Sequence, residues 1–276
     1  MEPTQSRVLK DLRIPSFREN THRILRLTGD SSANSKDFAR LIVVDPGLST
    51  QVLKLVNSAL YALRRRVTSI PEACVLLGLR NLRSLCLAGA LADELAEGTR
   101  REISACWEYS LLTGGVAQHL AQVICPEAEA DVSAAGLLHA VGLIALLGTE
   151  RVGYEAIIEA AQARAVDWSV VEREQLRTDH AEVAEAIGRR WKLRDEVCEL
   201  LGGWERLCSG AGTPGLCLAV ASAWVQIQRP SFQHFANPTG RLAMLRGDYA
   251  GEMAVVESQL EPALERASLQ LEILRR

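Results

Sequence analysis

Apolar residues along the chain recur every three or four positions, which is the spacing that places side chains on one face of an α-helix. Alternation at every second position, which would predict a half-buried strand, is nearly absent. Leu and Ala are abundant, and both favour helix because they lose little conformational freedom in it. The clearest predicted helices cover residues 131–147, 150–164, 169–177, 179–191, 216–227 and 249–276. Residues 228–240 contain Pro230, Pro238 and several polar residues, and are predicted to be a loop. We therefore expect an all-α protein built from many helices.

Polar residues mark several of the predicted helix ends. Asp45 is placed to cap a helix that Pro46 begins, and the pair Asn57-Ser58 can satisfy backbone groups where that helix ends. Ser69 and Glu72 have the spacing of a capping box at the start of the next helix. The simplest interpretation of these residues is structural, although Asp45 and the Asn-Ser pair would also suit a functional site.

The predicted helices fall into two groups that divide near residues 98–103. We expect a small N-terminal helical subdomain over residues 1–100 and a larger one over residues 101–276, which ends in an amphipathic helix. The apolar stripe of that last helix has mixed spacings of three and four, and Pro262 interrupts it. The stripe can pack within the chain or pair two copies, so a homodimer through this helix is one expectation.

Charge is nearly balanced over the 276 residues, with 31 Lys and Arg against 34 Asp and Glu and a formal net charge of −3. This balance predicts no general attraction to nucleic acid or to an anionic membrane. The run of Arg64, Arg65 and Arg66 is a local exception in a predicted loop. Such a run is usually solvated, but it can also bind an anionic or phosphorylated partner surface through bidentate contacts.

The first residues of the chain and the cysteines indicate in which cellular compartment the protein is found. Residues 1–13 are polar and charged, so no signal peptide is predicted. The most apolar stretch, residues 134–147, is too short to span a bilayer, and we expect it to be a buried core helix. The seven cysteines are odd in number and show no C-x-x-C spacing, which favours free buried thiols. These features predict a cytoplasmic protein that does not contact a membrane.

Several short motifs follow one another in a distinctive order. Asp45-Pro46-Gly47-Leu48 precedes the run at residues 53–59, and Leu137-Leu138-His139-Ala140-Val141-Gly142 lies near the middle of the chain. Thr178-Asp179-His180-Ala181-Glu182-Val183 comes next and is followed by Trp191-Lys192-Leu193. The ordered set resembles the HDOD family, whose domains are output modules related to the HD phosphohydrolases. The resemblance covers roughly residues 10–205.

This resemblance implies a fold and a role. The family fold is all-helical, with a small N-terminal subdomain packed on a larger HD-like subdomain. The implied role is bacterial regulation, often downstream of phosphorelay or cyclic-dinucleotide signalling, with other signalling proteins as partners.

The residues that would hold a metal depart from the pattern of active HD hydrolases. Those enzymes use an early His, a His-Asp pair, a later Asp or His and a His-His pair to bind the metal that acidifies a water. The corresponding positions here read Tyr109-Ser110, His139-Ala140 and Gly203-Trp204, and Ala140 supplies neither a ligand nor a base. Only His139 and His180 remain, and two imidazoles rarely hold a metal without a third ligand.

We therefore expect a non-catalytic regulatory module that binds signalling proteins, with no metal or other cofactor. His139 and His180 are expected to be core residues that bond backbone carbonyls. One alternative is a sensor that binds a small ligand, such as a nucleotide second messenger, in the degenerate pocket beside these histidines. The other is a metal-dependent phosphohydrolase with atypical ligands.

Overall fold

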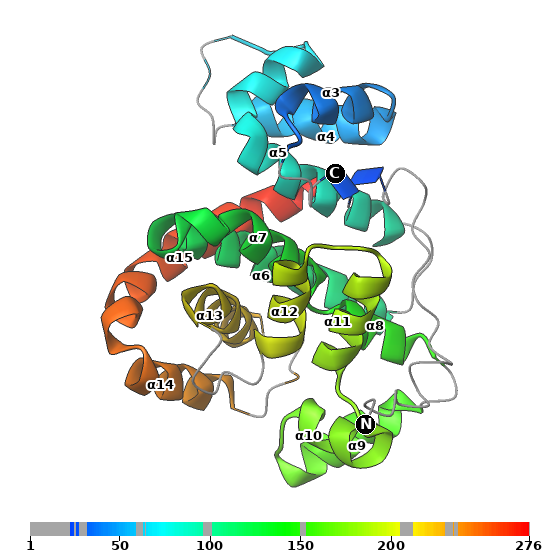
Figure 1. Cartoon of the computed structure of the whole chain (residues 1–276), viewed down its shortest axis with the longest axis vertical. Coiled ribbons are helices and arrows are strands. Elements are labelled where there is room, and N and C mark those ends of the chain that lie inside the picture. The colour runs from blue at the N-terminus through cyan, green and yellow to red at the C-terminus, as the bar shows by residue number, and fades with distance from the viewer. Residues whose placement is uncertain are drawn as a thin grey trace.

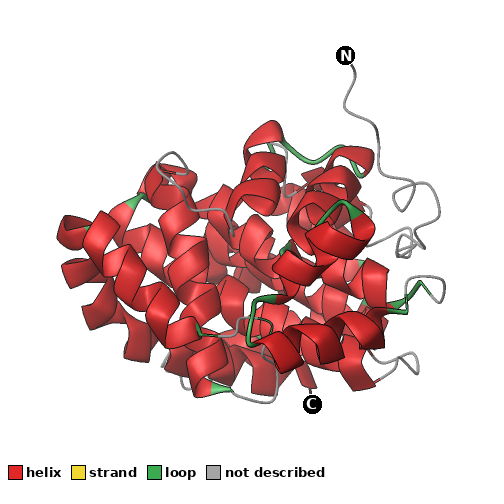
Figure 2. Ribbon diagram, turned by 90° about the horizontal axis from the view of Figure 1, so that it is seen from below, coloured by secondary structure: helices red, strands yellow, loops and turns green. Residues whose placement is uncertain are grey.

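The computed structural model describes residues 23–24, 26–27, 32–58, 63, 65–95, 101–149, 153–204, 212–229, 234 and 237–275. Every regular element in these ranges is a helix, so the predicted all-α class is confirmed (Figure 2). The helices are α3 (Ser35–Val43), α4 (Pro46–Val56), α5 (Ile70–Leu95), α6 (Arg101–Ile124), α7 (Glu129–Leu138), α8 (Val141–Leu147), α9 (Tyr154–Arg164), α10 (Trp168–Leu176), α11 (His180–Arg190), α12 (Asp195–Gly203), α13 (Gly212–Gln228), α14 (Pro238–Asp248) and α15 (Ala250–Arg275), with a 3₁₀ turn, η2, at Pro126–Ala128.

Helices α3, α4 and α5 pack together at one end of the molecule, at the top of Figure 1. Asp45 caps α4 as predicted, since its carboxylate accepts the amide proton of Leu48 at 3.0 Å, and Pro46 is the first helical residue. Helix α5 is interrupted at Gly78, whose φ of 72° lies in the left-handed region that glycine tolerates best. The N-terminal part is thus a layer of short helices.

Asn57 joins the end of α4 to the chain that precedes α5. Its amide nitrogen donates to the carbonyls of Leu53 and Val67 at 2.7 and 2.8 Å, and its Oδ1 accepts the amide proton of Val67 at 2.8 Å. The Ser58 hydroxyl donates to the Leu55 carbonyl at 2.7 Å. These contacts match the structural role that we predicted for the Asn-Ser pair.

Helix α6 is the centre of the larger part, where it packs against α7, α13 and α15. Figure 1 shows α13 enclosed by α6, α7, α12 and α14, and α13 is buried on most faces, as its apolar sequence predicts. The described cysteines are free and buried, in agreement with the sequence. The apolar face of α15 is buried against α6, and Pro262 lies inside one continuous helix. Pairing of two copies through α15 therefore remains only a prediction.

Two predictions about helix boundaries were wrong. The helix expected over residues 131–147 is divided into α7 and α8 by a turn at His139-Ala140. In addition, α14 begins at Pro238, inside a stretch that we had assigned to a loop up to residue 240. Within the described residues, one stretch, Pro126–Leu147, is apolar and long enough to cross a membrane, and most of it is buried in the protein.

Candidate functional site

Three residues that the family resemblance places at metal-ligand positions lie close together in the structure. Tyr109 comes from α6, His139 from the turn after α7, and Trp204 from the end of α12. The ring centroids of Tyr109 and His139 are 4.8 Å apart, and those of His139 and Trp204 are 5.2 Å apart, in edge-to-face arrangements. All three side chains are buried. The sequence therefore selected residues that the fold brings together, and each of them contributes an aromatic ring.

His180 and His234 complete this ring cluster. The centroids of the two imidazoles are 5.4 Å apart, and His234 lies 5.4 Å from Tyr109 and 5.9 Å from Trp204. The backbone of His234 is fixed by a bond from its amide to Oε1 of Gln226, at 3.0 Å. We name the five residues Tyr109, His139, His180, Trp204 and His234 the ring cluster.

Sequence reasoning missed His234 because it lies in a segment whose prolines and polar residues predict a loop. A signal was present in the sequence Phe-Gln-His-Phe at residues 232–235. Two phenylalanines so close together are unfavourable in a solvated loop, and they indicate a segment that packs on the core.

His139 is held by the helix that precedes it. Its Nδ1 lies 2.7 Å from the carbonyl oxygen of Gly136, and because a carbonyl only accepts, Nδ1 must be the donor. This bond competes for the carbonyl that an unbroken helix would offer to Ala140, in agreement with the end of α7 at this point. The prediction that His139 is a core residue bonded to a backbone carbonyl is thereby confirmed.

Gly142 allows α8 to cross the first turn of α11 at very short range. A Cβ atom added at this position would lie 1.9 Å from the carbonyl oxygen of His180 and 2.7 Å from the amide nitrogen of Ala184. Both neighbours are backbone atoms, so neither can move aside as a flexible side chain would. The close crossing brings His180 next to the turn that carries His139.

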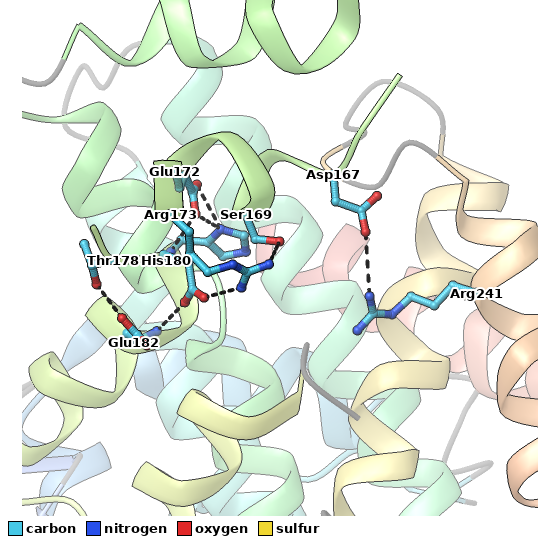
Figure 3. A network of polar contacts seen from close by, with 9 residues as sticks. Asp167, Ser169, Glu172, Arg173, Thr178, His180, Glu182 and Arg241 are labelled. Carbon is cyan, nitrogen blue, oxygen red and sulfur yellow. Dashed lines mark hydrogen bonds and ion pairs between the residues drawn. The ribbon is translucent and has the colours of Figure 1, made fainter. Parts of the chain in front are cut away.

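Glu172 of α10 fixes His180 from the other side, as Figure 3 shows. One carboxylate oxygen of Glu172 accepts the backbone N–H of His180 at 2.8 Å and also lies 2.8 Å from Nδ1 of the imidazole. The other carboxylate oxygen accepts the Tyr154 hydroxyl. Both Glu172 and His180 are buried. His180 is a core residue, as predicted, but its side-chain partner is a carboxylate and not a carbonyl.

Asp179 is the second carboxylate next to the histidines, and it has structural partners. One oxygen caps α11 by accepting the amide proton of Glu182 at 2.8 Å, while the other pairs with Arg173 at 2.6 Å. The Glu182 carboxylate in turn accepts the Thr178 hydroxyl at 2.9 Å (Figure 3). Trp191 ends the same helix as its C-cap and is half-buried.

The residues around the ring cluster do not fit the metal that HD hydrolases bind. In the part of the chain that the structure describes, no three His, Cys, Asp or Glu side chains are placed to hold a metal ion. The carboxylates of Glu172 and Asp179 are each held by at least two donors. Ala140, which the family resemblance places at the aspartate position of the His-Asp pair, is buried and apolar. We therefore derive no reaction step through a metal.

The arginine run lies in the N-terminal part, away from the ring cluster. Arg65 pairs with Glu72, and Arg64 lies outside the described residues. The Ser69 hydroxyl accepts the amide proton of Glu72 at 3.5 Å, so this hydrogen bond of the predicted capping box is long. Arg65 and Arg66 line an open groove of about 810 Å³, together with Thr50, Leu53, Lys54, Asn57, Leu63, Val67 and Thr68.

A model of the HDOD domain family matches residues 14–203 of the chain. An uncharacterized protein of Treponema pallidum (strain Nichols) is 30% identical over 185 residues, which cover 67% of this chain. They cover only 36% of that protein, so the chain spans about a third of the length of this relative.

Solved structures share the fold. A candidate signal transduction protein of Marinobacter aquaeolei VT8 has a TM-score of 0.73 at 19% identity, over 97% of this chain and 60% of that one. A candidate phosphohydrolase of Shewanella amazonensis SB2B has a TM-score of 0.71 at 20% identity, over 97% of this chain and 99% of that one. With the family match extending over more than half of its length, the chain belongs to the HDOD domain family.

Proposed function

We propose that this HDOD protein is a non-catalytic regulatory module that acts by binding other proteins. The observation that carries the proposal is the ring cluster. Positions that supply metal ligands in HD hydrolases come together here, but Tyr109 and Trp204 place rings against His139 where ligands would be required. The phenol ring of Tyr109 and the indole of Trp204 stabilise a packed core through edge-to-face contacts, and neither is a usual ligand of a divalent cation.

The hydrogen bonds of the two sequence-predicted histidines hold both side chains in the core. His139 and His180 each use Nδ1 within the protein, and the buried carboxylate of Glu172 orients His180. In a metalloenzyme such a carboxylate would orient a ligating imidazole toward the metal. Here it joins α10 to α11, so this remnant of the site stabilises the fold.

A test of catalysis uses the purified chain with Mn²⁺ added. We expect substoichiometric metal after desalting and no hydrolysis of cyclic dinucleotides or of (p)ppGpp. Stoichiometric bound metal, together with turnover that His180→Gln abolishes in a folded variant, would overturn the proposal. Circular dichroism of the variant distinguishes loss of a ligand from loss of the fold.

The groove beside α4 is the surface that we propose for partner binding. Lys54, Arg65 and Arg66 line it, and within the described part of the chain neither Lys54 nor Arg66 has an ion-pair partner. Leu63 adds an exposed apolar side chain to the same groove. Unpaired cations beside an apolar residue suit an acidic protein segment that carries an apolar anchor.

Charge reversal tests this surface. A pull-down from native lysate would compare the wild type with the double variant Arg65→Glu, Arg66→Glu and with the control Arg190→Glu, which changes an exposed arginine of α11 outside the groove. We expect proteins captured by the wild type and the control to be lost from the double variant. Equal capture by all three chains would show that the groove does not bind the partners. The proposal that the protein is non-catalytic would be unaffected.

A further inference from the structure

A second cavity lies where α5 meets α6 and α15, at the junction of the two helical groups. Its outer part has a volume of about 240 Å³, and its inner part of about 30 Å³ is the size of one water molecule. Both parts are lined by Asn81 of α5, Gly115 and Gln118 of α6, and Ala267 and Gln270 of α15. We name these two connected parts the amide groove.

The floor of the amide groove is apolar and closely packed. The inner part is lined by the leucines at positions 85, 111, 137 and 271. A Cβ atom added to Gly115 would lie 2.7 Å from Cβ of Ala267, so α6 and α15 meet at short range beside the groove. The inner part is too small for a ring, so the ring of a ligand would lie in the outer part, above this floor.

The wall of the groove is rich in acceptors whose orientation is fixed. Nε2 of Gln118 and Nε2 of Gln122 both donate to the same carboxylate oxygen of the buried Glu129, at 3.0 and 2.9 Å. Because a carboxylate only accepts, the carbonyl oxygen of each glutamine must face away from Glu129. Asn81 is oriented in the same way, since its amide nitrogen donates to the Leu77 carbonyl at 2.8 Å.

Gln118 presents a hydrogen-bond acceptor to the groove from a nearly buried side chain. Its side chain is only 6% exposed, and its carbonyl oxygen has no hydrogen-bond partner among the described residues. This oxygen is not fully enclosed by the protein and lies on the wall of the groove, so a donor group of a ligand can reach it. Gln270, on the facing helix, likewise has no internal partner in the part of the chain described, so its amide can donate or accept.

The mouth of the groove differs in charge from its interior. Arg266 lines the outer part, is exposed, and has no ion-pair partner among the described residues. His119 lies beside it and bonds Oε1 of Gln259 at 3.2 Å. An acceptor-rich interior with a cation at its mouth fits a ligand that has N–H donors at one end and a negative charge at the other.

We propose that the amide groove binds the base of a guanine nucleotide, with its phosphate at Arg266. A guanine edge presents two adjacent donors, N1–H and the N2 amino group, next to the O6 acceptor. The carbonyls of Gln118 and Asn81 match the donors, and the Gln270 amide matches O6. Adenine offers one donor group on this edge, so the same acceptors favour guanine. The inference goes beyond the proposed function and does not depend on the loss of a metal site.

Calorimetric titration of the full chain tests the proposal, with guanosine monophosphate, guanosine and adenosine monophosphate as probes. We expect guanosine monophosphate to bind about tenfold or more tightly than adenosine monophosphate, the discrimination expected of one well-paired base contact. Gln270→Leu should weaken both guanine probes about tenfold. Gln228→Leu serves as the control, because Gln228 is also half-buried but lines neither cavity.

Arg266→Gln separates the phosphate contact from the base contact. We expect it to weaken guanosine monophosphate about tenfold and to leave guanosine unchanged, since a charge-assisted bond is lost only where a phosphate is present. Three results would overturn the proposal: no binding of guanosine monophosphate at millimolar concentration, equal affinity for the adenine nucleotide, or affinities that Gln270→Leu does not change. Circular dichroism of each variant confirms that the chain is folded.

Discussion

Replacing Glu172 by glutamine tests how much the fold depends on the carboxylate that orients His180. In the wild type, this buried carboxylate accepts hydrogen bonds from the backbone N–H of His180, from Nδ1 of the His180 imidazole and from the Tyr154 hydroxyl. Glutamine keeps one acceptor oxygen and turns two N–H donors toward groups that are themselves donors. Removing one partner from a buried charged arrangement typically costs about 3–5 kcal/mol. We expect Glu172→Gln to lose that much, a large part of the roughly 5–15 kcal/mol that stabilises a typical domain.

The matched control is Glu174→Gln, two residues further along the same helix. Glu174 pairs with Arg164, but the two side chains are 52% and 44% exposed, so solvent screens the pair and the change should have little effect on stability. Urea unfolding followed by far-UV circular dichroism and by tryptophan fluorescence gives the free energies, and the two signals should coincide if unfolding is two-state. A loss from Glu172→Gln no larger than that from Glu174→Gln would refute the reasoning.

Three further changes test other parts of the structure. Gly142→Ala should cost about 3 kcal/mol or more, since its Cβ would strike backbone of α11, whereas Gly203→Ala meets nothing within 4 Å and should leave the melting temperature unchanged or raise it. Asn57→Ala removes three hydrogen bonds at the end of α4; we expect a loss of about 1–3 kcal/mol in urea unfolding and faster proteolysis of the following segment, and unchanged proteolysis would count against its role. Burial lowers the pKa of His119 from its ordinary 6.5. The hydrogen bond to Gln259 raises this pKa, and the positive charge of Arg266 lowers it further. The unfolded chain therefore binds this proton first, and stability falls as the pH drops below about 6.5 toward the folded pKa. His119→Gln should show a shallower loss of stability over that range, and an identical pH profile would exclude the effect.

Much of the fold could be predicted because local signals and tertiary packing agree. Asp45 and Pro46 mark the start of α4 by chemistry that acts within one turn, and Asp179 marks α11 in the same way. The break between α7 and α8 could not be predicted from apolar spacing. It depends on the bond from His139 to a carbonyl of its own helix, and on a crossing with α11, which lies some forty residues further along the chain.

The candidate site was predicted in part for a similar reason. The resemblance located His139, His180 and the substituted positions at Tyr109 and Trp204, and the structure brings these residues together. His234 was missed because only the tertiary fold brings its imidazole next to Tyr109 of α6 and Trp168 of α10. The amide groove could not be predicted from the sequence, because its residues come from three helices and no motif links Asn81 to Gln118 and Gln270.

Helix α5 has a consequence for how the protein folds. It packs against α3 and α4 and also contacts α6, α7 and α15, so the same helix contributes to both groups of helices. Neither group can complete its apolar core without α5, and a chain cut near residue 100 would leave the α5-facing surfaces of α6 and α7 exposed to water. We therefore expect the two groups to unfold in one cooperative transition, with no stable intermediate in which only one of them is folded.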